Sequence, residues 1–346
     1  MRTPLRFEPI LRRYLWGGRR LGTVLGKAIG PEDDYAESWE IVDHGDDQSR
    51  VIAGPLAGRT LGAIFAEFGE ALFGERYDAW RSEERPAGLQ HRFPLLLKFL
   101  DCRRDLSVQI HPNDAQARRQ DPPDLGKTEA WYVMDAEPGA AVYAGLVTGA
   151  TRDDLARAIA EGRTESVLHR FHPRPGDCLF IPAGTVHALG AGLLVAELQQ
   201  ASDTTYRLFD WNRVGSDGRP RALHVEQSLA VLRDDCGPVE SVRPIRIDDH
   251  RERLVEAPQF VLDRIRVDRA GPVRNDRVSG GSGTLGGDGT FHVIAVVEGE
   301  GRLEGDPTGR PLRRGETALI PAGCGAVRFE PGDSGAVLLD GYLPAR

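Results

Sequence analysis

Short apolar segments separated by polar turns dominate the chain. Residues 37–42 and 48–53 form two such segments around one turn, and residues 95–100 form an apolar run interrupted only by Lys98. Residues 107–200 mostly repeat this pattern, and short segments return after about residue 240. Such lengths and turn signals predict β-strands, so we expect a mainly β fold.

Three helices interrupt the predicted strands. Thr60 precedes apolar residues at helical spacing, from Leu61 to Leu72, as an N-cap would. Thr151 and Asp154 resemble a capping box, and Gly162 ends that segment. A short helix is expected within residues 113–120. The composition of residues 279–289 (SGGSGTLGGDG) predicts a solvent-exposed loop.

An internal repeat indicates two copies of one β-architecture. Residues 174–187 (RPGDCLFIPAGTVH) align without gaps with residues 313–326 (RRGETALIPAGCGA). His187 in the first copy corresponds to Ala326 in the second. Any site that uses His187 is therefore expected only once in the chain.

Composition narrows the function classes. The 346 residues include 41 glycines and 23 prolines, which favour many turns, and 40% are hydrophobic, which excludes disorder of the whole chain. The formal net charge is −8 and the basic residues are scattered, so a nucleic-acid partner is not expected. Four dispersed cysteines suit a reducing compartment. Without a signal-like N-terminus or long apolar stretch, we expect a cytoplasmic protein that does not span membranes.

Polar side chains with possible chemical roles occur at three places, two of which are pairs that share a strand face. Gln109 and His111 alternate along one segment, as do Lys127 and Glu129 in the next. His187 follows a Pro-Ala-Gly turn. Gln109, His111, Glu129 and His187 together offer nitrogen and oxygen ligands that suit a divalent metal with an open position. Each of them alone has an ordinary structural explanation.

This arrangement resembles a cupin barrel, although residues 112–128 separate His111 from Glu129 by more than most cupins have. Longer strings narrow the resemblance to type I phosphomannose isomerase in its shorter bacterial form. They are FPLLLKFLD, LSVQIHPND, GKTEAWYVM, PGDCLFIPAGTVHAL and ELQQASDTTYRLFDWNR, with YLWGG and AESWEIVDH near the N-terminus. Together they span roughly residues 7–235.

The resemblance implies a fold, a site and a reaction. It implies a catalytic cupin domain over residues 1–240 with helical insertions, and a degenerate cupin-like barrel over residues 241–346. The helix over residues 151–161 would then cover one barrel mouth. It implies one zinc ion bound by the four metal candidates, although the ligand types also permit manganese, cobalt or iron. It further implies that Lys98, Lys127 and Arg207 bind a sugar phosphate, with Lys127 and Arg207 acting in catalysis.

The implied activity is the interconversion of mannose 6-phosphate and fructose 6-phosphate through an enediol. An iron-dependent oxygenase and a non-catalytic sugar-sensing cupin are the alternatives. The cations beside the predicted ligands disfavour the oxygenase, because such an enzyme needs no cationic phosphate pocket. The complete set of four ligands disfavours the sugar-sensing cupin, for which the loss of a ligand would be expected. The proton-transfer group stays open among Lys127, Glu197, Asp203 and a zinc-bound water, and the oligomeric state stays open as well.

Overall fold

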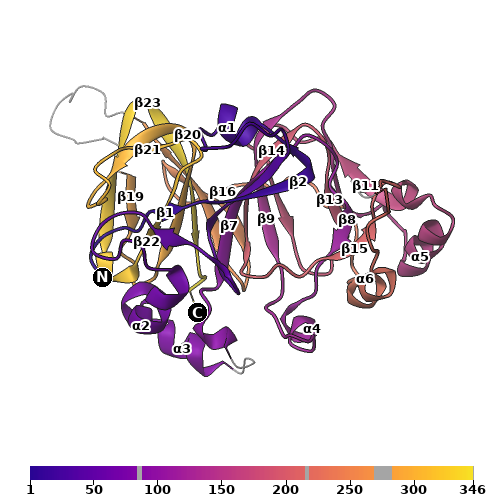
Figure 1. The fold of residues 1–346 in the computed structure, drawn as a ribbon, viewed down its shortest axis with the longest axis horizontal. Coiled ribbons are helices and arrows are strands. Elements are labelled where there is room, and N and C mark those ends of the chain that lie inside the picture. The colour runs from indigo at the N-terminus through magenta and orange to yellow at the C-terminus, as the bar shows by residue number, and fades with distance from the viewer. Residues whose placement is uncertain (84–87, 215–217, 269–282, 346) are drawn as a thin grey trace.

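The computed structural model describes residues 1–83, 88–214, 218–268 and 283–345. Most of the regular structure is β-strand, as predicted, and the strands form three large sheets (Figure 1). The sheet nearest the C-terminus lies at one end of the molecule, and helices α5 (Arg152–Ala160) and α6 (Val225–Val231) lie at the other. In the part of the chain that is described, no helix has the length and apolar character needed to cross a membrane.

Two of the large sheets are built from the first two thirds of the chain. The six-stranded sheet has the order β12-β9-β14-β7-β3-β2, with β12 Cys178–Ile181, β9 Glu129–Ala136, β14 Leu193–Gln200, β7 Leu95–Cys102, β3 Tyr35–Ile41 and β2 Ile10–Gly18. The five-stranded sheet has the order β11-β10-β13-β8-β15, with β11 Leu168–Phe171, β10 Val142–Leu146, β13 His187–Leu189, β8 Val108–Ile110 and β15 Tyr206–Phe209. The strands predicted at residues 37–42 and 95–100 are thus confirmed in β3 and β7.

The third large sheet is C-terminal. Its order is β16-β17-β18-β23-β20-β21, with β16 Ile245–Arg246, β17 Arg251–Glu256, β18 Val261–Val267, β23 Ala326–Tyr342, β20 His292–Leu303 and β21 Leu312–Arg313. Two further strands pair with it, β19 Gly283–Gly286 with β23 and β22 Thr317–Ile320 with β20. Two small sheets pair β1 Phe7–Glu8 with β6 Arg50–Val51 and β4 Asp43–His44 with β5 Asp47–Gln48. Residues 48–53, predicted as one strand, therefore hold the last residue of β5 and the whole of the two-residue strand β6.

Both predicted cap motifs are present in the helices. The Thr60 side chain accepts a hydrogen bond from the Ala63 amide at the start of α2 (Leu61–Phe73), and Thr151 and Asp154 form the capping box of α5. The predicted insertion helix is α4 (Asp114–Ala117). The other helices are α1 Arg20–Thr23 and α3 Tyr77–Ser82, with 3₁₀ turns at Leu89–His91, Thr164–Val167 and Ala322–Cys324.

Helix α5 does not lie where the resemblance placed it. Its buried residues Leu155 and Ala158 pack in one cluster with Val108 and Ile110 of β8. These strand residues point away from the face that carries Gln109, because side chains alternate along a strand. The helix therefore covers the outer face of the five-stranded sheet and not a barrel mouth, because its apolar side chains are buried against that face.

The internal repeat is visible as equivalent strands. The first copy gives β12 and the second gives β22, and each is followed by the Pro-Ala-Gly turn. The predicted loop over residues 279–289 is wrong at Gly283–Gly286, which form β19 with Leu285 fully buried. Residues 279–282 lie outside the described part of the chain. Pairing with β23 and burial of Leu285 outweigh the weak strand preference of glycine.

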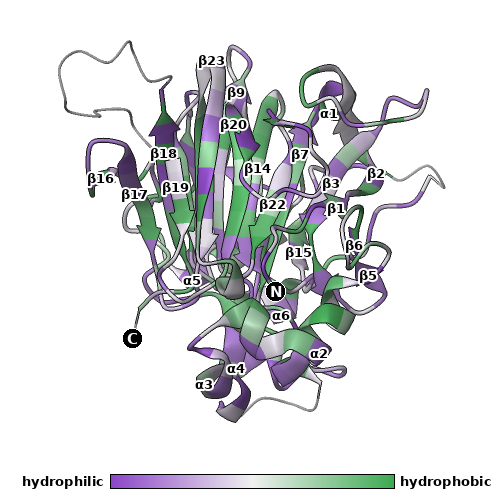
Figure 2. Cartoon of the chain, turned by 90° about the vertical axis from the view of Figure 1, so that its left-hand side faces the viewer, coloured by the Kyte–Doolittle hydropathy of each residue, from purple (hydrophilic) through white to green (hydrophobic). Residues whose placement is uncertain are grey.

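Apolar residues concentrate in the strands at the middle of the molecule, such as β7 and β14 (Figure 2), in which every residue is buried. One hydrophobic cluster joins the six-stranded sheet to the C-terminal sheet, with Leu97 and Leu198 on one side and Val293 and Leu339 on the other. The N-terminal segment also pairs with the C-terminal sheet, through a bridge between Leu5 and Leu319. The division at residues 240 and 241 stays a prediction.

Candidate metal centre

Three predicted metal ligands converge between the two sheets of the first part of the chain. His111 directly follows β8, Glu129 begins β9 in the facing sheet, and His187 begins β13. The Nε2 atoms of the two histidines are 3.2 Å apart. Glu129 Oε1 is 3.3 Å from His111 Nε2, and Glu129 Oε2 is 3.7 Å from His187 Nε2. All three residues are at most 1% exposed.

Backbone carbonyls fix both imidazoles in the tautomer that a metal needs. His111 Nδ1 lies 2.8 Å from the Thr204 carbonyl oxygen, and His187 Nδ1 lies 2.8 Å from that of Thr185. A carbonyl oxygen only accepts hydrogen bonds, so each Nδ1 carries the proton and each neutral ring directs an Nε2 lone pair toward the other. Two lone pairs and a carboxylate that face one another in a buried space form a donor set that could hold a metal cation. Glu129 Oε2 also lacks any hydrogen-bond partner.

The spacing of these atoms suits a small metal ion. Metal–ligand bonds of about 2.0–2.1 Å at tetrahedral angles place neighbouring ligand atoms roughly 3.3 Å apart. The observed separations of 3.2, 3.3 and 3.7 Å agree with that value. The donor set therefore fits a divalent metal held by two nitrogens and a carboxylate oxygen.

The protonation states of the three residues agree with this interpretation. Burial, together with the nearby ammonium of Lys127, lowers the pKa of His111 to about 3, and burial also lowers the pKa of His187. Burial by itself would raise the pKa of Glu129, but Lys127 and His111 outweigh it and hold that pKa well below its usual range. At neutral pH the site thus presents neutral imidazoles and an ionised carboxylate, the forms that bind metals.

Gln109, the fourth predicted ligand, lies beside the cluster. It pairs directly with His187 across the β8–β13 ladder and with Arg207 across the β8–β15 ladder. Directly opposed residues in neighbouring strands point to the same face of a sheet. One row of side chains that face the interior therefore contains Gln109, His187 and Arg207. Arg207 lies two strand spacings, or about 10 Å, from His187 along this row.

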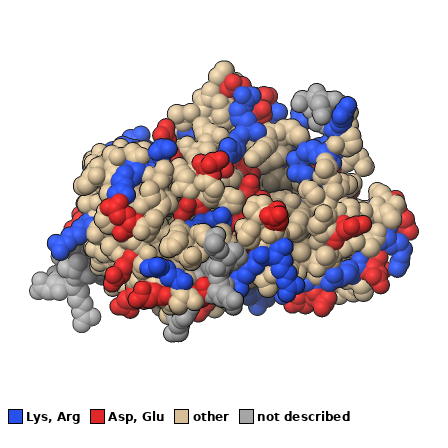
Figure 3. All heavy atoms as spheres, turned by 60° about the horizontal axis from the view of Figure 1, so that its bottom comes forward, with Lys and Arg blue, Asp and Glu red and all other residues tan. Residues whose placement is uncertain are grey.

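A cavity of ≈ 290 Å³ opens beside the cluster, between the two sheets. Its lining contains all the predicted substrate-binding residues together with two of the predicted metal ligands. The charged and amide residues lining it are Glu37, Lys98, Gln109, Lys127, Glu129, Glu197, Asp203, Arg207 and Arg221. On the face of the molecule in Figure 3, charged side chains of both signs are interspersed among the described residues. The cations that face the cavity are therefore a more distinctive candidate site for an anion than this surface is.

The two lysines of the cavity are each paired with a carboxylate. Lys127 Nζ is 3.2 Å from Glu129 Oε1, and Lys98 Nζ is 3.2 Å from Glu197 Oε1 and 3.8 Å from a Glu37 oxygen. Burial would lower the pKa of Lys98, but Glu197 and Glu37 more than offset it and raise that pKa. Burial and the charge of Glu129 raise the pKa of Glu197 to about 7.

Arg207 and Arg221 place two guanidinium groups on the cavity wall. Arg207 donates one hydrogen bond to the Ala222 carbonyl, while its buried Nε has no partner. Burial and the charge of Arg221 lower the pKa of Arg207. Arg221 is held by two hydrogen bonds to Asp210. Sequence reasoning missed Arg221, because it lies in a loop without a strand pattern.

The fold is mainly β, and its facing sheets enclose a buried His–His–Glu cluster and a cavity with cationic groups. These features define a candidate metalloprotein that binds an anionic ligand.

Residues 5–140 match the model of the phosphomannose isomerase type I catalytic domain. Mannose-6-phosphate isomerase ManA of Bacillus subtilis is 35% identical over 329 residues, which cover 94% of this chain and 96% of that protein. The mannose-6-phosphate isomerase of Streptococcus mutans is 32% identical, covering 93% of each chain.

Solved structures agree with this relationship. The crystal structure of the mannose 6-phosphate isomerase from Bacillus subtilis superposes with a TM-score of 0.83 at 28% identity, covering 99% of this chain and all of that one. A phosphomannose isomerase from Salmonella typhimurium, at 15% identity and a TM-score of 0.76, shares the fold. The chain belongs to the type I phosphomannose isomerase family.

Proposed function

We propose that this protein is a metal-dependent aldose–ketose isomerase that interconverts mannose 6-phosphate and fructose 6-phosphate through an enediol. The observation that carries the proposal is the pair of unprotonated imidazole nitrogens that face Glu129, beside a cavity with inward-facing cations. Family membership supports the same reaction, because the named relatives are mannose-6-phosphate isomerases.

The proposed cofactor is one zinc ion per chain, held by His111, Glu129 and His187 with Gln109 as a fourth ligand. Two nitrogens and two oxygens are a suitable donor set for zinc, and a substrate oxygen would be added by expansion to five-coordination. When bound, the ion would supply a Lewis acid that stabilises negative charge developing on the substrate oxygens. The chain orients this site through the Thr204 and Thr185 carbonyls, which set the two imidazole rings.

The cations of the cavity are proposed to bind and orient the sugar phosphate. Arg207, with an unpartnered buried Nε, and the neighbouring Arg221 offer donors that suit the planar recognition of a phosphate. Lys98 and Lys127 lie in the interior, where they would contact the hydroxyl and carbonyl oxygens of the sugar. Because Lys127 also contacts Glu129, it would meet the end of the substrate that lies at the metal.

Proton transfer between the two substrate carbons is proposed to use Lys127, Glu197 or Asp203, all of which line the cavity. Glu197 has the strongest physical support, since a carboxyl group with a pKa of about 7 can both accept and release a proton at neutral pH. Its ion pair with Lys98 fixes its position.

The proposal also extends to organisation and location. Residues 1–240 would form the catalytic cupin domain, and residues 241–346 would form a second cupin-like barrel that has lost the metal site. The absence of a histidine at position 326 supports this division of roles. A metabolic isomerase with four free cysteines suits the cytoplasm.

A coupled assay tests the substrate assignment. The purified protein is incubated with mannose 6-phosphate, and fructose 6-phosphate formation is followed. Unphosphorylated mannose serves as the matched control, because it keeps the reacting carbons and lacks only the group that Arg207 and Arg221 would bind. We expect turnover of the phosphate ester and little of mannose. Equal turnover of both, or none of either with the metal bound, contradicts the proposal.

A further inference from the structure

The loop between β14 and β15 carries a link from the metal cluster to a second, distant group of polar residues. The Thr204 carbonyl in this loop accepts the hydrogen bond from His111 Nδ1. The Thr204 hydroxyl lies 3.0 Å from Asp124 Oδ2, and the Thr204 amide donates to the Ser202 hydroxyl, which itself donates to Asp124 at 2.8 Å. Thr204 is therefore tied to Asp124 through both its side chain and its backbone.

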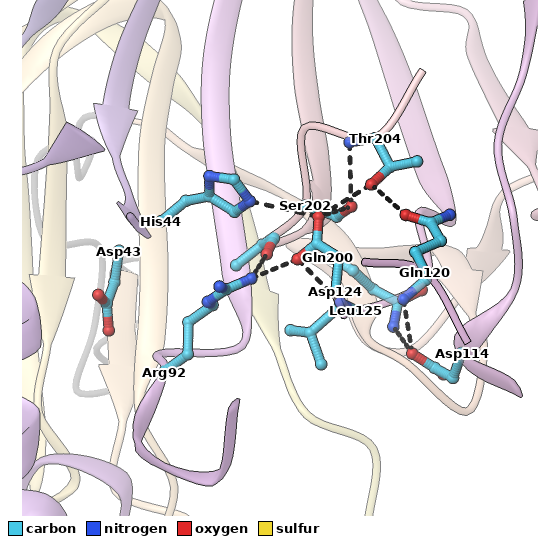
Figure 4. A network of polar contacts seen from close by, with 12 residues as sticks. Asp43, His44, Arg92, Asp114, Gln120, Asp124, Leu125, Gln200, Ser202 and Thr204 are labelled. Atoms are coloured by element: carbon cyan, nitrogen blue, oxygen red, sulfur yellow. Dashed lines mark hydrogen bonds and ion pairs between the residues drawn. The ribbon is translucent and has the colours of Figure 1, made fainter. Parts of the chain in front are cut away.

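Asp124 is the centre of the network in Figure 4. Its Oδ1 accepts hydrogen bonds from Arg92 and from the Leu125 amide, and its Oδ2 lies 3.3 Å from His44 Nε2 in addition to the Ser202 and Thr204 hydroxyls. The residue is 7% exposed. Asp124 thus has partners in three other segments of the chain, at His44, at Arg92 and at residues 202–204, and each partner restricts the position of its carboxylate.

A second contact keeps the Thr204 side chain in place. Gln120 Oε1 is 3.2 Å from the Thr204 hydroxyl and shares the single proton of that hydroxyl with the nearer Asp124 Oδ2, and the Gln120 amide nitrogen donates to the Tyr206 hydroxyl at 2.7 Å. Arg92 also donates to the Ala201 carbonyl at the start of the same loop. The loop that sets the His111 ring is therefore fixed by residues that do not line the cavity.

We propose that Asp124 is a positioning residue of the metal centre, which acts through Thr204 to hold the carbonyl that orients His111. The ring of His111 can direct Nε2 toward Glu129 and His187 only while its Nδ1 proton has this acceptor. Groups that accept the second ring N–H of a metal-ligating histidine typically change metal affinity 10–100-fold when they are removed, and for Asp124, one contact further from the ring, we expect the lower end of that range. The inference rests on the proposed metal site and adds a residue outside the cavity to it.

A purely structural role for Asp124 predicts a different result, and Asp43 provides the matched control. Asp43 is also a buried aspartate, 6% exposed, that accepts hydrogen bonds from the Phe93 amide and the Gln48 side chain. It lies beside the same network in Figure 4, yet it makes no contact with Ser202, Thr204 or His111 among the described residues. An Asp→Asn change at either position removes one buried charge and replaces one acceptor oxygen by an amide group, which at Asp43 faces one donor and at Asp124 faces at least two.

The experiment measures zinc affinity by competition with a chromophoric chelator for the wild type, D124N, T204V, the double variant and D43N. We expect D124N and T204V each to weaken zinc binding about 10-fold. The zinc affinity of the double variant should equal that of the single variant with the lower affinity, because both changes break the same link. D43N should keep the wild-type affinity even where its thermal stability falls as far as that of D124N.

Several results overturn the inference. Equal zinc affinities in D124N and D43N would reduce Asp124 to a stabilising residue, and additive losses in the double variant would show that it does not act through Thr204. If D124N fails to fold, T204V decides alone, since valine matches threonine in shape and removes only the hydroxyl. A wild-type protein that binds no zinc overturns the metal centre itself and this inference with it.

Discussion

Removing one imidazole tests the metal centre most sharply, and His187→Ala is the variant of choice. His187 is fully buried, and its Nε2 lies 3.2 Å from that of His111 and 3.7 Å from Glu129. Structural zinc in zinc-finger peptides binds with roughly 10–16 kcal/mol, so one of four ligands corresponds to about 3 kcal/mol, or about 10²-fold in affinity. We expect that loss of zinc affinity and a parallel loss of activity at limiting zinc.

Thermal unfolding with and without zinc gives a second measurement on the same variant. At zinc concentrations 1,000-fold above Kd, binding stabilises the wild type by about 4 kcal/mol. For a chain of 346 residues this raises Tm by about 5 °C. His187→Ala should lose most of the shift at the same zinc concentration. The reasoning is refuted if His172→Ala, which removes only a hydrogen bond to the Ala140 carbonyl, reduces zinc affinity and the shift equally.

Three further predictions follow from other parts of the structure. Arg207→Ala should lower kcat/KM for mannose 6-phosphate roughly 10- to 100-fold, the value of lost charge-assisted hydrogen bonds, with zinc content unchanged; unaltered kinetics would remove Arg207 from the phosphate site. If Glu197 is the base, activity falls as pH drops through its pKa, which burial raises above the usual range of a glutamate, and Glu197→Gln abolishes that limb of the pH–rate profile; a variant that retains the limb assigns it to another group. Ion pairs with Asp340 and Asp288 outweigh the effect of burial and raise the pKa of His292 to about 10, above about 6.5 in the unfolded chain. The resulting stability is complete below about pH 6.5 and is lost as pH rises toward 10. His292→Gln should therefore destabilise the protein more at pH 6 than at pH 10 in denaturant titrations, and an equal effect at both would contradict this assignment.

Much of the metal centre could be predicted from local sequence. Strand alternation placed Gln109 and His111 on one face, and the Pro-Ala-Gly turn placed His187 at the start of a strand. The structure brings His111, Glu129 and His187 together as those patterns suggested. Local patterns suffice here because His111, Glu129 and His187 each lie at the start of a strand or directly beyond one.

The supporting residues could not be predicted in the same way. The carbonyls of Thr204 and Thr185 orient the imidazoles, and a backbone acceptor has no side-chain signature. Asp124 lies 80 positions from Thr204 in the sequence, so their contact depends on how the sheets assemble. Arg221 reaches the cavity from a loop for the same reason.

Glycine content misled the prediction in the C-terminal part. Residues 279–289 have the composition of a flexible linker, yet Gly283–Gly286 pair with β23. Composition measures the intrinsic preference of a segment, whereas the pairing comes from an available strand edge and from the burial of Leu285. Tertiary packing therefore decided this element.

The most direct test of the central claim is a zinc titration of the metal-free protein with the isomerase reaction as the readout. The protein is stripped with a chelator, dialysed, and supplied with zinc in steps while the conversion of mannose 6-phosphate to fructose 6-phosphate is measured. The account predicts no activity without metal and a linear rise that levels off at one zinc per chain. Full activity in the metal-free protein, or one bound zinc per chain without any turnover, would contradict it.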